Sequence, residues 1–220
     1  MGLTLSISNV YKSYTGRHVL KDCSYSFERS GTYILTGPNG SGKSTVFRIC
    51  TLLEDPDRGD VNYLLEGSAV TRTIELRRRI TLLLPKVGVF NTTVFKNVAY
   101  GLTIRGINRD EISERVMKAL DFVGLEHKTN QKALTLSSGE TQRLGIARAM
   151  VIEPEILFLD EPTASVDQEN TEIIENIILK MRNMGKSIVV ITTHDMPQAK
   201  RLADWLLFMK DGKIVPFSQQ

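Results

Sequence analysis

A glycine-rich stretch, GPNGSGKST at residues 37–45, has the residue types and spacing needed to hold phosphate. It fits the pattern G-x-x-x-x-G-K-[ST], in which backbone N–H groups turn inward around phosphate oxygens and glycine avoids a Cβ clash. Lys43 would place its charge beside the β- and γ-phosphates, and the Ser44 hydroxyl would coordinate Mg²⁺. The candidate binding residues are Gly37, Pro38, Asn39, Gly40, Ser41, Gly42, Lys43, Ser44 and Thr45. This loop by itself leaves kinases, GTPases and motor proteins open.

A second stretch, ILFLDEP at 156–162, carries two adjacent carboxylates at the end of an apolar run. A strand that ends in Asp160 places this carboxylate beside a metal, where it would be a ligand together with Ser44. Glu161 points the other way and is placed to orient or deprotonate the water that attacks the γ-phosphate. Without the upstream glycine-rich loop, Asp-Glu-Pro would be interpreted as an ordinary turn.

A third stretch, LTLSSGETQRLGIARAM at 134–150, places two hydroxyls and a glycine before a helical pattern. The first backbone N–H groups of a helix are unpaired, so Ser137, Ser138 and Gly139 favour an anion site. The alternative is an ordinary helix start with Ser137 as the N-cap.

Hydrophobic periodicity predicts the elements that position these residues. Strands are expected at 3–9, 24–28, 33–37, 61–65, 80–84, 155–160 and 187–193. Helices are expected through 46–53, over 94–123 and over 168–183, and an Asp-Gly hairpin over 204–217. Strands that alternate with helices predict an α/β fold with a mainly parallel core sheet. The helical stretch from about 90 to 150 interrupts this alternation and predicts an inserted subdomain.

Composition narrows the class of protein. The 220 residues carry a net charge of only +3, and the basic residues are dispersed, so nucleic acid is not an expected partner. Cys23 and Cys50 lie in apolar surroundings without metal-ligand spacing, which favours reduced, buried residues of a cytosolic protein. No apolar run approaches the ~18 residues of a membrane span, and the N-terminus lacks the pattern of a signal peptide.

The order of the motifs closely resembles the ATP-binding cassette (ABC) family over essentially the whole chain. After the glycine-rich loop come LSSGE (136–140), LDEP (159–162), ASVD (164–167) and TTHD (192–195). The resemblance implies one α/β domain with a P-loop NTPase core. Residues 1–89 and 151–220 would form this RecA-like core and an N-terminal antiparallel β subdomain, and residues 90–150 the helical signature subdomain. It also implies ATP and Mg²⁺ as ligands and ATP hydrolysis as the reaction.

The resemblance assigns a partner to the serine-glycine motif. Two subunits of this family pack head to tail, and each signature covers the γ-phosphate held by the other P-loop. The residues that match are Ser137, Ser138, Gly139 and Glu140. Asp167 matches the aspartate of the loop that crosses this interface. The partner would be a second copy of the chain, in an ATP-dependent homodimer, or a paired ABC subunit.

The remaining matches concern catalysis and the base. His194 matches the histidine that contacts the γ-phosphate, so Lys43, Glu161 and His194 are the candidate catalytic residues. Tyr14 matches the aromatic that stacks on adenine, with Tyr11 as its rival.

The sequence departs from the family pattern at two positions. Ser138 stands where the signature usually has glycine. Pro85 stands where members carry a glutamine that meets the metal, and no glutamine lies between residues 46 and 130. Proline offers no side-chain ligand, so Mg²⁺ would take water there, and coupling to a partner is in question.

The resemblance therefore implies the ATPase subunit of an ABC transporter, which drives a separate transmembrane permease from the cytoplasmic face of the membrane. The segment HKTNQKALT (127–135) is similar to importer subunits for tungstate, phosphate and related oxyanions, which work with a substrate-binding protein. Because the chain stops after the last hairpin, we expect no further C-terminal regulatory domain. Two alternatives stay open: an ABC ATPase that transports nothing, and a nucleotide-binding regulatory module with little turnover.

Overall fold

The apolar runs of the sequence form the centre of a six-stranded sheet in the computed structural model, which describes residues 2–217. The strand order is β10-β9-β3-β8-β7-β6. The bounds are β3 Gly31–Thr36, β6 Ile80–Leu83, β7 Ile156–Asp160, β8 Ile188–Thr192, β9 Trp205–Lys210 and β10 Lys213–Pro216. Strands β9, β3, β8 and β7 run parallel, and β10 pairs with β9 through the expected Asp-Gly hairpin. Every residue of β3, β7 and β8 is buried, as expected for strands covered on both faces.

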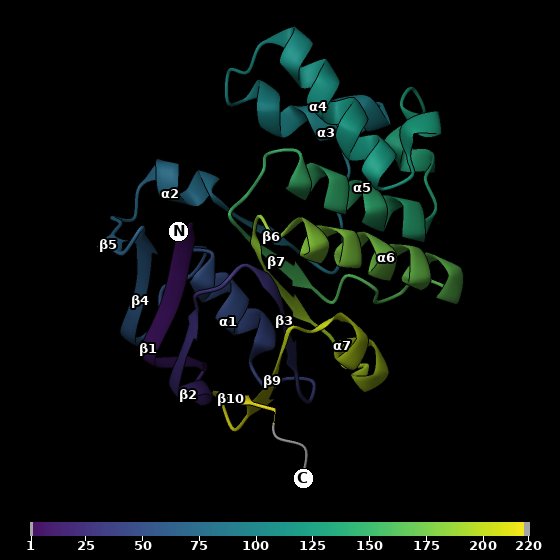
Figure 1. Ribbon diagram of the computed structural model, residues 1–220. Helices are drawn as coiled ribbons and strands as arrows, with labels where there is room; N and C mark the ends of the chain where they lie inside the picture. Colours follow the sequence, from purple (N-terminus) through teal and green to yellow (C-terminus); the bar gives the residue numbers. More distant parts are fainter. Residues whose placement is uncertain (1, 218–220) are drawn as a thin grey trace. The chain divides into compact units, whose positions relative to one another are not determined.

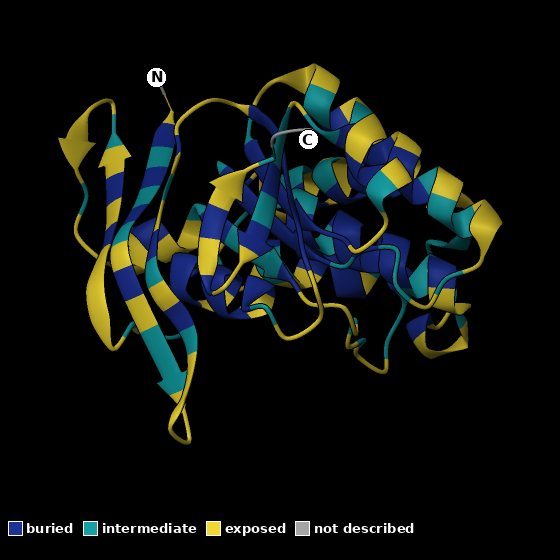
Figure 2. Cartoon of the chain, turned by 90° about the horizontal axis from the view of Figure 1, so that it is seen from below, coloured by how far each residue is buried: buried dark blue, intermediate teal, exposed yellow. Residues whose placement is uncertain are grey.

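A second sheet is antiparallel and lies at the N-terminus. Its order is β2-β1-β4-β5, with β1 Leu3–Tyr14, β2 Arg17–Phe27, β4 Arg58–Leu65 and β5 Ser68–Ala69. Buried and exposed residues alternate along these strands (Figure 2). The parallel core sheet and the N-terminal antiparallel sheet confirm the predicted fold class.

The strands β1 and β2 are longer than the sequence pattern predicts. The pairing of β1 with β2 shifts register between Ile7 and Val10, and Asn9 has a φ of 50°. Such a bulge moves the buried side chains from odd to even positions, so the alternation that predicts 3–9 breaks while the strand continues.

Helix α1, Lys43–Cys50, shares a hydrophobic core with both sheets (Figure 1). The ring of Phe47 packs 4.9 Å from that of Phe158 on β7, and the hydroxyl of Tyr63 on β4 donates to the Cys50 carbonyl at 2.6 Å. Both cysteines are free and buried, as predicted. The sequence pattern predicts that this helix continues through residue 53, and this prediction is wrong. The helix ends at Cys50, because the backbone turns left-handed at Leu52 (φ 59°).

Two short helices complete the first compact unit, which comprises Met1–Leu82, Glu155–Glu161 and Met181–Gln220. They are α2, Ile74–Arg78, and α7, Met196–Leu202. Helix α7 packs against β3, and Asp195 caps it by accepting from the backbone N–H of Gln198 at 2.9 Å.

The second compact unit comprises Leu83–Pro154 and Pro162–Lys180 and is helical. Its elements are α3 Val94–Thr103, α4 Arg109–Phe122, η1 Glu126–Lys128, η2 Ala133–Thr135, α5 Ser138–Met150 and the greater part of α6 Gln168–Met184. The stretch 94–123, which the sequence predicts to be helical, consists of two helices and a turn between them. The chain turns at Gly106, whose φ of 74° suits glycine, and Asn108 then caps α4 by accepting from the backbone N–H of Glu111 at 2.9 Å.

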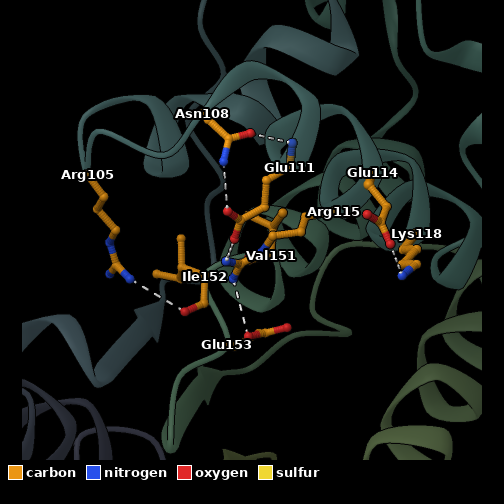
Figure 3. A network of polar contacts seen from close by, with 9 residues as sticks. All are labelled: Arg105, Asn108, Glu111, Glu114, Arg115, Lys118, Val151, Ile152 and Glu153. Carbon is orange, nitrogen blue, oxygen red and sulfur yellow. Dashed lines mark hydrogen bonds and ion pairs between the residues drawn. The ribbon is translucent and has the colours of Figure 1, made fainter.

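A polar network ties α4 to the C-terminal end of α5 (Figure 3). The Arg115 guanidinium donates to the Val151 carbonyl at 2.8 Å and pairs with Glu111 and Glu153 at 3.2 and 3.3 Å. Arg105 reaches the neighbouring Ile152 carbonyl at 3.4 Å. These bonds pair carbonyls at the end of α5 that the helix cannot pair itself.

Between residues 2 and 217, the structure contains no helix with the length and apolar character of a membrane span.

Candidate nucleotide site

Three segments that carry chemistry leave the core sheet at one edge. The P-loop follows β3, Asp160 ends β7, and Thr192 ends β8, which lies between those two strands. The register pairs Leu35 with Thr192 and Thr192 with Asp160. Since neighbouring strands are about 4.8 Å apart, β3 and β7 are about 10 Å apart at this edge. The fold therefore brings Lys43, Asp160, Glu161 and His194 to one region of the first unit.

Glycine is required in the P-loop at positions where its backbone is left-handed and crowded. Gly37 has a φ of 142°, and a Cβ there would lie 2.7 Å from the Met209 carbonyl oxygen. Gly42, with a φ of 108°, is the N-cap of α1, and a Cβ there would meet a methyl of Leu20 at 2.9 Å. The loop is thus held in its curled conformation by β2 and β9.

The Lys43 ammonium is held inside this loop. Its Nζ donates to the carbonyls of Gly37 and Pro38 at 2.8 and 3.1 Å, and the residue is buried. Ser41 carries a buried hydroxyl without a hydrogen-bond partner among the described residues. A cation and a free hydroxyl in a curl of backbone form a donor set that fits the oxygens of a nucleotide phosphate.

The Asp160 carboxylate and the Glu161 backbone are joined through Thr192, which the sequence patterns did not identify. The Thr192 hydroxyl donates to Asp160 Oδ1 at 2.7 Å and accepts from the backbone N–H of Glu161 at 2.9 Å. Asp160 is only 3% exposed, so this bond fixes its orientation. The sequence signal was present as the first threonine of TTHD, but the role depends on the pairing of β7 with β8.

Glu161 has a strained backbone and a histidine beside it. Its φ of 48° is unusual for a residue with a side chain and costs of order 1 kcal/mol or more, a feature that clusters at functional sites. Its carboxylate Oε1 lies 3.9 Å from Nδ1 of His194, whose side chain is two-thirds exposed. The two side chains can therefore act on one ligand at this sheet edge.

The residues predicted to hold Mg²⁺ suit that ion. Ser44 is exposed at the start of α1, and Asp160 offers its second carboxylate oxygen. Mg²⁺ binds oxygen ligands and usually keeps several waters, so one hydroxyl and one carboxylate are sufficient together with phosphate oxygens. Within residues 2–217, no group of three or more His, Cys, Asp or Glu side chains is arranged to hold a metal without phosphate.

Tyr14 lies at the end of β1, beside the last residue of the P-loop. Its hydroxyl donates to the carboxylate of Glu54, and the Thr45 side chain also interacts with this hydroxyl. The rival, Tyr11, is similarly exposed, but it pairs across the sheet with Arg58 on β4.

A pocket of about 290 Å³ adjoins the P-loop on the side of the β9–β10 hairpin. Pro38–Ser41 line it together with the start of β2 and the hairpin. Three basic residues that the sequence patterns did not single out also line it: Arg17, Lys21 and Lys210. Their charge makes the surroundings of the P-loop favourable for an anionic ligand.

The signature residues begin α5 in the second unit. Ser137 is the N-cap, and it forms a capping box with Glu140: the Ser137 side chain accepts from the Glu140 backbone at 3.3 Å, and Glu140 accepts from the Ser137 backbone at 2.9 Å. The alternative of an ordinary cap is therefore confirmed as local structure. It does not exclude an anion site, because Ser137 and Ser138 are exposed at a helix N-terminus.

Glu140 is held in its charged form. Burial opposes ionisation, but the Lys128 ammonium and the Ser137 backbone outweigh it and lower the pKa of this carboxyl. Lys128 forms a close ion pair with Glu140. The negative charge of Glu140 is thus paired with the Lys128 ammonium within the second unit.

Gly139 and Asp167 are linked by one asparagine. A Cβ on Gly139 would lie 2.1 Å from Cγ of Asn170, so only glycine fits under that side chain. Asn170 donates to Asp167 from its backbone at 2.8 Å and from its side-chain amide at 3.0 Å, and these bonds lower the pKa of Asp167. The signature and the ASVD segment are therefore one connected surface, through a residue that the sequence patterns did not identify.

Pro85 lies exposed in the segment that follows β6 and belongs to the second unit, as do the signature and Asp167. The predicted site residues thus fall into two sets. Tyr14, the P-loop, Asp160, Glu161 and His194 share the first unit. Pro85, Ser137–Glu140 and Asp167 share the second.

The comparisons with known proteins agree with these motifs. A family model described as ABC transporter matches residues 20–164. The tungstate uptake system ATP-binding protein TupC of Peptoclostridium acidaminophilum is 40% identical over 212 residues, which cover 96% of this chain and 97% of that protein. The phosphate import ATP-binding protein PstB 2 of Natronomonas pharaonis is 37% identical over 96% of this chain and 78% of its own length.

A solved structure shares the fold. CbiO1 of Clostridium perfringens, part of the ABC transporter complex CbiONQ, superposes with a TM-score of 0.85 and 29% sequence identity. The match covers 96% of this chain and 86% of that one.

Proposed function

Because the chain belongs to the ABC transporter family as an ATP-binding, ATP-hydrolysing subunit, we propose that it powers a separate permease by closing and opening a head-to-tail dimer on Mg-ATP. The observation that carries this proposal is the single sheet edge at which the P-loop, Asp160, Glu161 and Thr192 meet. A phosphate cradle and a pair of adjacent acidic residues come together at this edge.

In the proposed reaction, water attacks the γ-phosphorus, the bond to the β-phosphate oxygen breaks, and ADP and phosphate form. Lys43 and the backbone N–H groups of the P-loop hold the phosphates, and Glu161 orients the water and accepts its proton. His194, 3.9 Å from Glu161, contacts the γ-phosphate. Mg²⁺, held by Ser44 and Asp160, neutralises phosphate charge when bound.

The site residues of the second unit would act on the nucleotide of the other subunit. Ser137 and Ser138 present exposed hydroxyls at the N-terminus of α5 and, with the adjacent Gly139, would cover the γ-phosphate of the partner, while Asp167 would cross the interface. Two hydrogen bonds to a charged group at each of two sites give roughly 6–12 kcal/mol gross, against an association cost of about 4–15 kcal/mol. Loss of the γ-phosphate removes these contacts, so hydrolysis opens the dimer.

The exposed aromatic residues of the second unit favour a protein partner. The rings of Phe90 and Tyr100 pack at a tilt with their centroids 4.7 Å apart, and the Arg148 guanidinium lies 4.9 Å from the Phe90 ring centroid. Aromatic and arginine side chains are enriched where proteins bind one another. We infer that this cluster contacts the permease, which would hold the subunit at the cytoplasmic face of the membrane.

The relatives favour import of an oxyanion. TupC and PstB 2 bear the names of tungstate uptake and phosphate import proteins, and this chain covers most of their length. An importer would also use a substrate-binding protein to deliver the anion.

The proline at position 85 would leave Mg²⁺ with one more water ligand than a glutamine would, which Mg²⁺ tolerates.

The direct test is Glu161→Gln. The variant should bind ATP but hydrolyse it at least about 100-fold more slowly, because a general base contributes about 10²–10⁴-fold. Steady-state ATPase assays, together with size-exclusion chromatography in Mg-ATP, measure both effects, and the variant should elute as a stable dimer. A variant that stays monomeric and hydrolyses ATP at the parental rate would contradict the proposal. A parent chain that binds ATP without turnover would favour the regulatory module instead.

A further inference from the structure

The turn after α1 presents an acidic side chain to the aromatic residue at the end of β1. Both carboxylate oxygens of Glu54 accept from the Tyr14 hydroxyl, at 2.7 and 2.6 Å. The Glu54 side chain is 22% exposed, so this contact is partly shielded from water. The phenol of Tyr14 is thus fixed at its far end, while its ring stays at the surface.

Glu54 is itself tied to the helix that the P-loop begins. Its backbone N–H donates to the Arg48 carbonyl in the last turn of α1 at 3.3 Å. Because Lys43 starts this helix and Glu54 follows its end, the position of the Tyr14 ring is mechanically coupled to the phosphate cradle. The Thr45 side chain, at the end of the P-loop, also interacts with the Tyr14 hydroxyl, so Glu54 adds a second connection between this ring and the phosphate cradle.

Lys12 forms an ion pair with the Glu54 carboxylate and helps to orient it. Its Nζ lies 3.2 Å from both Glu54 and Asp57 and donates to the Asp55 carbonyl at 2.8 Å. The same ammonium lies 5.7 Å from the Tyr14 ring centroid. Asp57 also accepts from the Ser13 backbone at 2.7 Å, so the end of β1 is anchored to this turn at several points.

The Tyr14 hydroxyl remains protonated at neutral pH. Its burial and the Glu54 carboxylate raise the pKa of this phenol above the ordinary value. The single proton is committed to Glu54, so the hydroxyl is not free to donate to a base edge. The ring offers a stacking face and no hydrogen bond to distinguish one purine from another.

We propose that Glu54 is a positioning residue for nucleotide binding, which holds the Tyr14 ring at a fixed place relative to the P-loop so that it can stack on the base. This inference rests on the proposed role of Tyr14. In this arrangement the Tyr14 hydroxyl serves as an anchor. The Glu54 carboxylate, which lies outside every recognised motif, sets the affinity for the base and leaves phosphate binding unchanged.

The test compares Glu54→Ala, Glu54→Gln and Tyr14→Ala with a matched control, Asp55→Ala. Asp55 lies in the same turn and carries the same charge, but its side chain pairs with Arg72 and does not touch Tyr14. For each variant, kcat and KM for Mg-ATP are measured, together with the inhibition constant of inorganic tripolyphosphate. Tripolyphosphate occupies the phosphate cradle without a base.

Glu54→Ala should raise KM for ATP about fivefold, less than Tyr14→Ala does, because the ring is loosened and not removed. The inhibition constant of tripolyphosphate and kcat should each stay within about twofold, because the base makes no contribution to either. Glu54→Gln retains an acceptor oxygen and should keep KM near the parental value. In a Tyr14→Phe background, Glu54→Ala should have no further effect, because the hydroxyl is already gone.

Three outcomes would overturn the inference. If Tyr14→Ala raises KM and Glu54→Ala does not, the base-stacking role stands and the positioning role is wrong. If tripolyphosphate binding weakens in parallel with ATP binding, Glu54 acts on the P-loop itself. If Tyr14→Ala leaves KM unchanged, the stacking role fails, and the inference fails with it. Asp55→Ala corrects each comparison for the loss of one negative charge.

Discussion

At the scale of single residues, one hydroxyl contacts both the proposed metal ligand Asp160 and the backbone of the proposed catalytic residue Glu161. Thr192 is completely buried, donates to Asp160 and accepts from the Glu161 backbone. The donated bond orients Asp160, and the accepted bond supports Glu161 in its left-handed conformation. Thr192 on β8 therefore orients the side chain of Asp160 and the backbone of the adjacent Glu161.

This arrangement predicts the effect of Thr192→Val, which keeps the shape of the side chain and removes the hydroxyl. The free energy of unfolding should fall by about 1–3 kcal/mol, because a buried carboxylate and a buried N–H lose their partner. ATP turnover should fall by more than ATP affinity, since the P-loop is untouched. Denaturant unfolding and ATPase assays measure the two effects, with Thr192→Ser as the control that retains the hydroxyl. Equal turnover in all three proteins would show that the hydroxyl is not needed.

At the scale of elements, hydrogen bonds and ion pairs at helix ends add to the apolar packing of the second unit. Arg115 on α4 reaches the carbonyl of Val151, just beyond α5, and two acidic side chains (Figure 3). Nearby, Lys118 on the same helix pairs with the exposed Glu114, four residues earlier. Helix α4 therefore carries both Arg115, which connects it to the chain after α5, and the exposed ion pair between Lys118 and Glu114.

Arg115→Ala should lower the free energy of unfolding by about 1.5–3 kcal/mol, chiefly because the Val151 carbonyl loses a charged donor. Lys118→Ala should change it by about 0.5 kcal/mol or less, as for exposed helical ion pairs. Thermal unfolding of the two variants beside the parent gives the comparison. A fall of similar size in both would mean that the network in Figure 3 contributes no more than a surface pair.

At the scale of the whole molecule, the predicted site residues are divided between two compact units. The P-loop set is proposed to bind the nucleotide of its own chain, and the signature set at α5 is proposed to act on a partner. A head-to-tail dimer would use each set once at each of two composite sites. The division therefore predicts that two chains must assemble to complete each site, and experiments on mixed chains can test this.

Ser137→Arg should abolish ATPase activity and leave ATP affinity of the monomer nearly unchanged, because the substitution blocks a surface that acts on the other chain. Mixing it with Lys43→Ala should restore activity above that of either variant alone. Each heterodimer then contains one site with an intact P-loop and an intact signature. Equilibrium ATP binding and turnover of the mixture are the measurements. Ser137→Arg monomers that no longer bind ATP would show that the motif serves its own chain.

The sequence alone determined the P-loop, the carboxylate pair and the fold class. These features depend on local rules: glycine where φ is positive, continuous apolar runs for doubly covered strands, and hydroxyls at a helix start. The same local rules failed where geometry changes within an element. The bulge at Asn9 reversed the alternation of β1, and the turn at Gly106 divided the predicted helical stretch over 94–123 into two helices.

Only the tertiary structure decided which side chains complete these motifs. Thr192 meets Asp160 because β8 pairs with β7, Glu54 meets Tyr14 because α1 leads back to the end of β1, and Asn170 covers Gly139 because α6 passes over the start of α5. Each contact joins residues separated by about 30 or more positions, and no periodicity in either segment records it. Sequence patterns report the conformation of neighbouring residues, whereas these contacts arise from the packing of whole elements, which is set by the shared core.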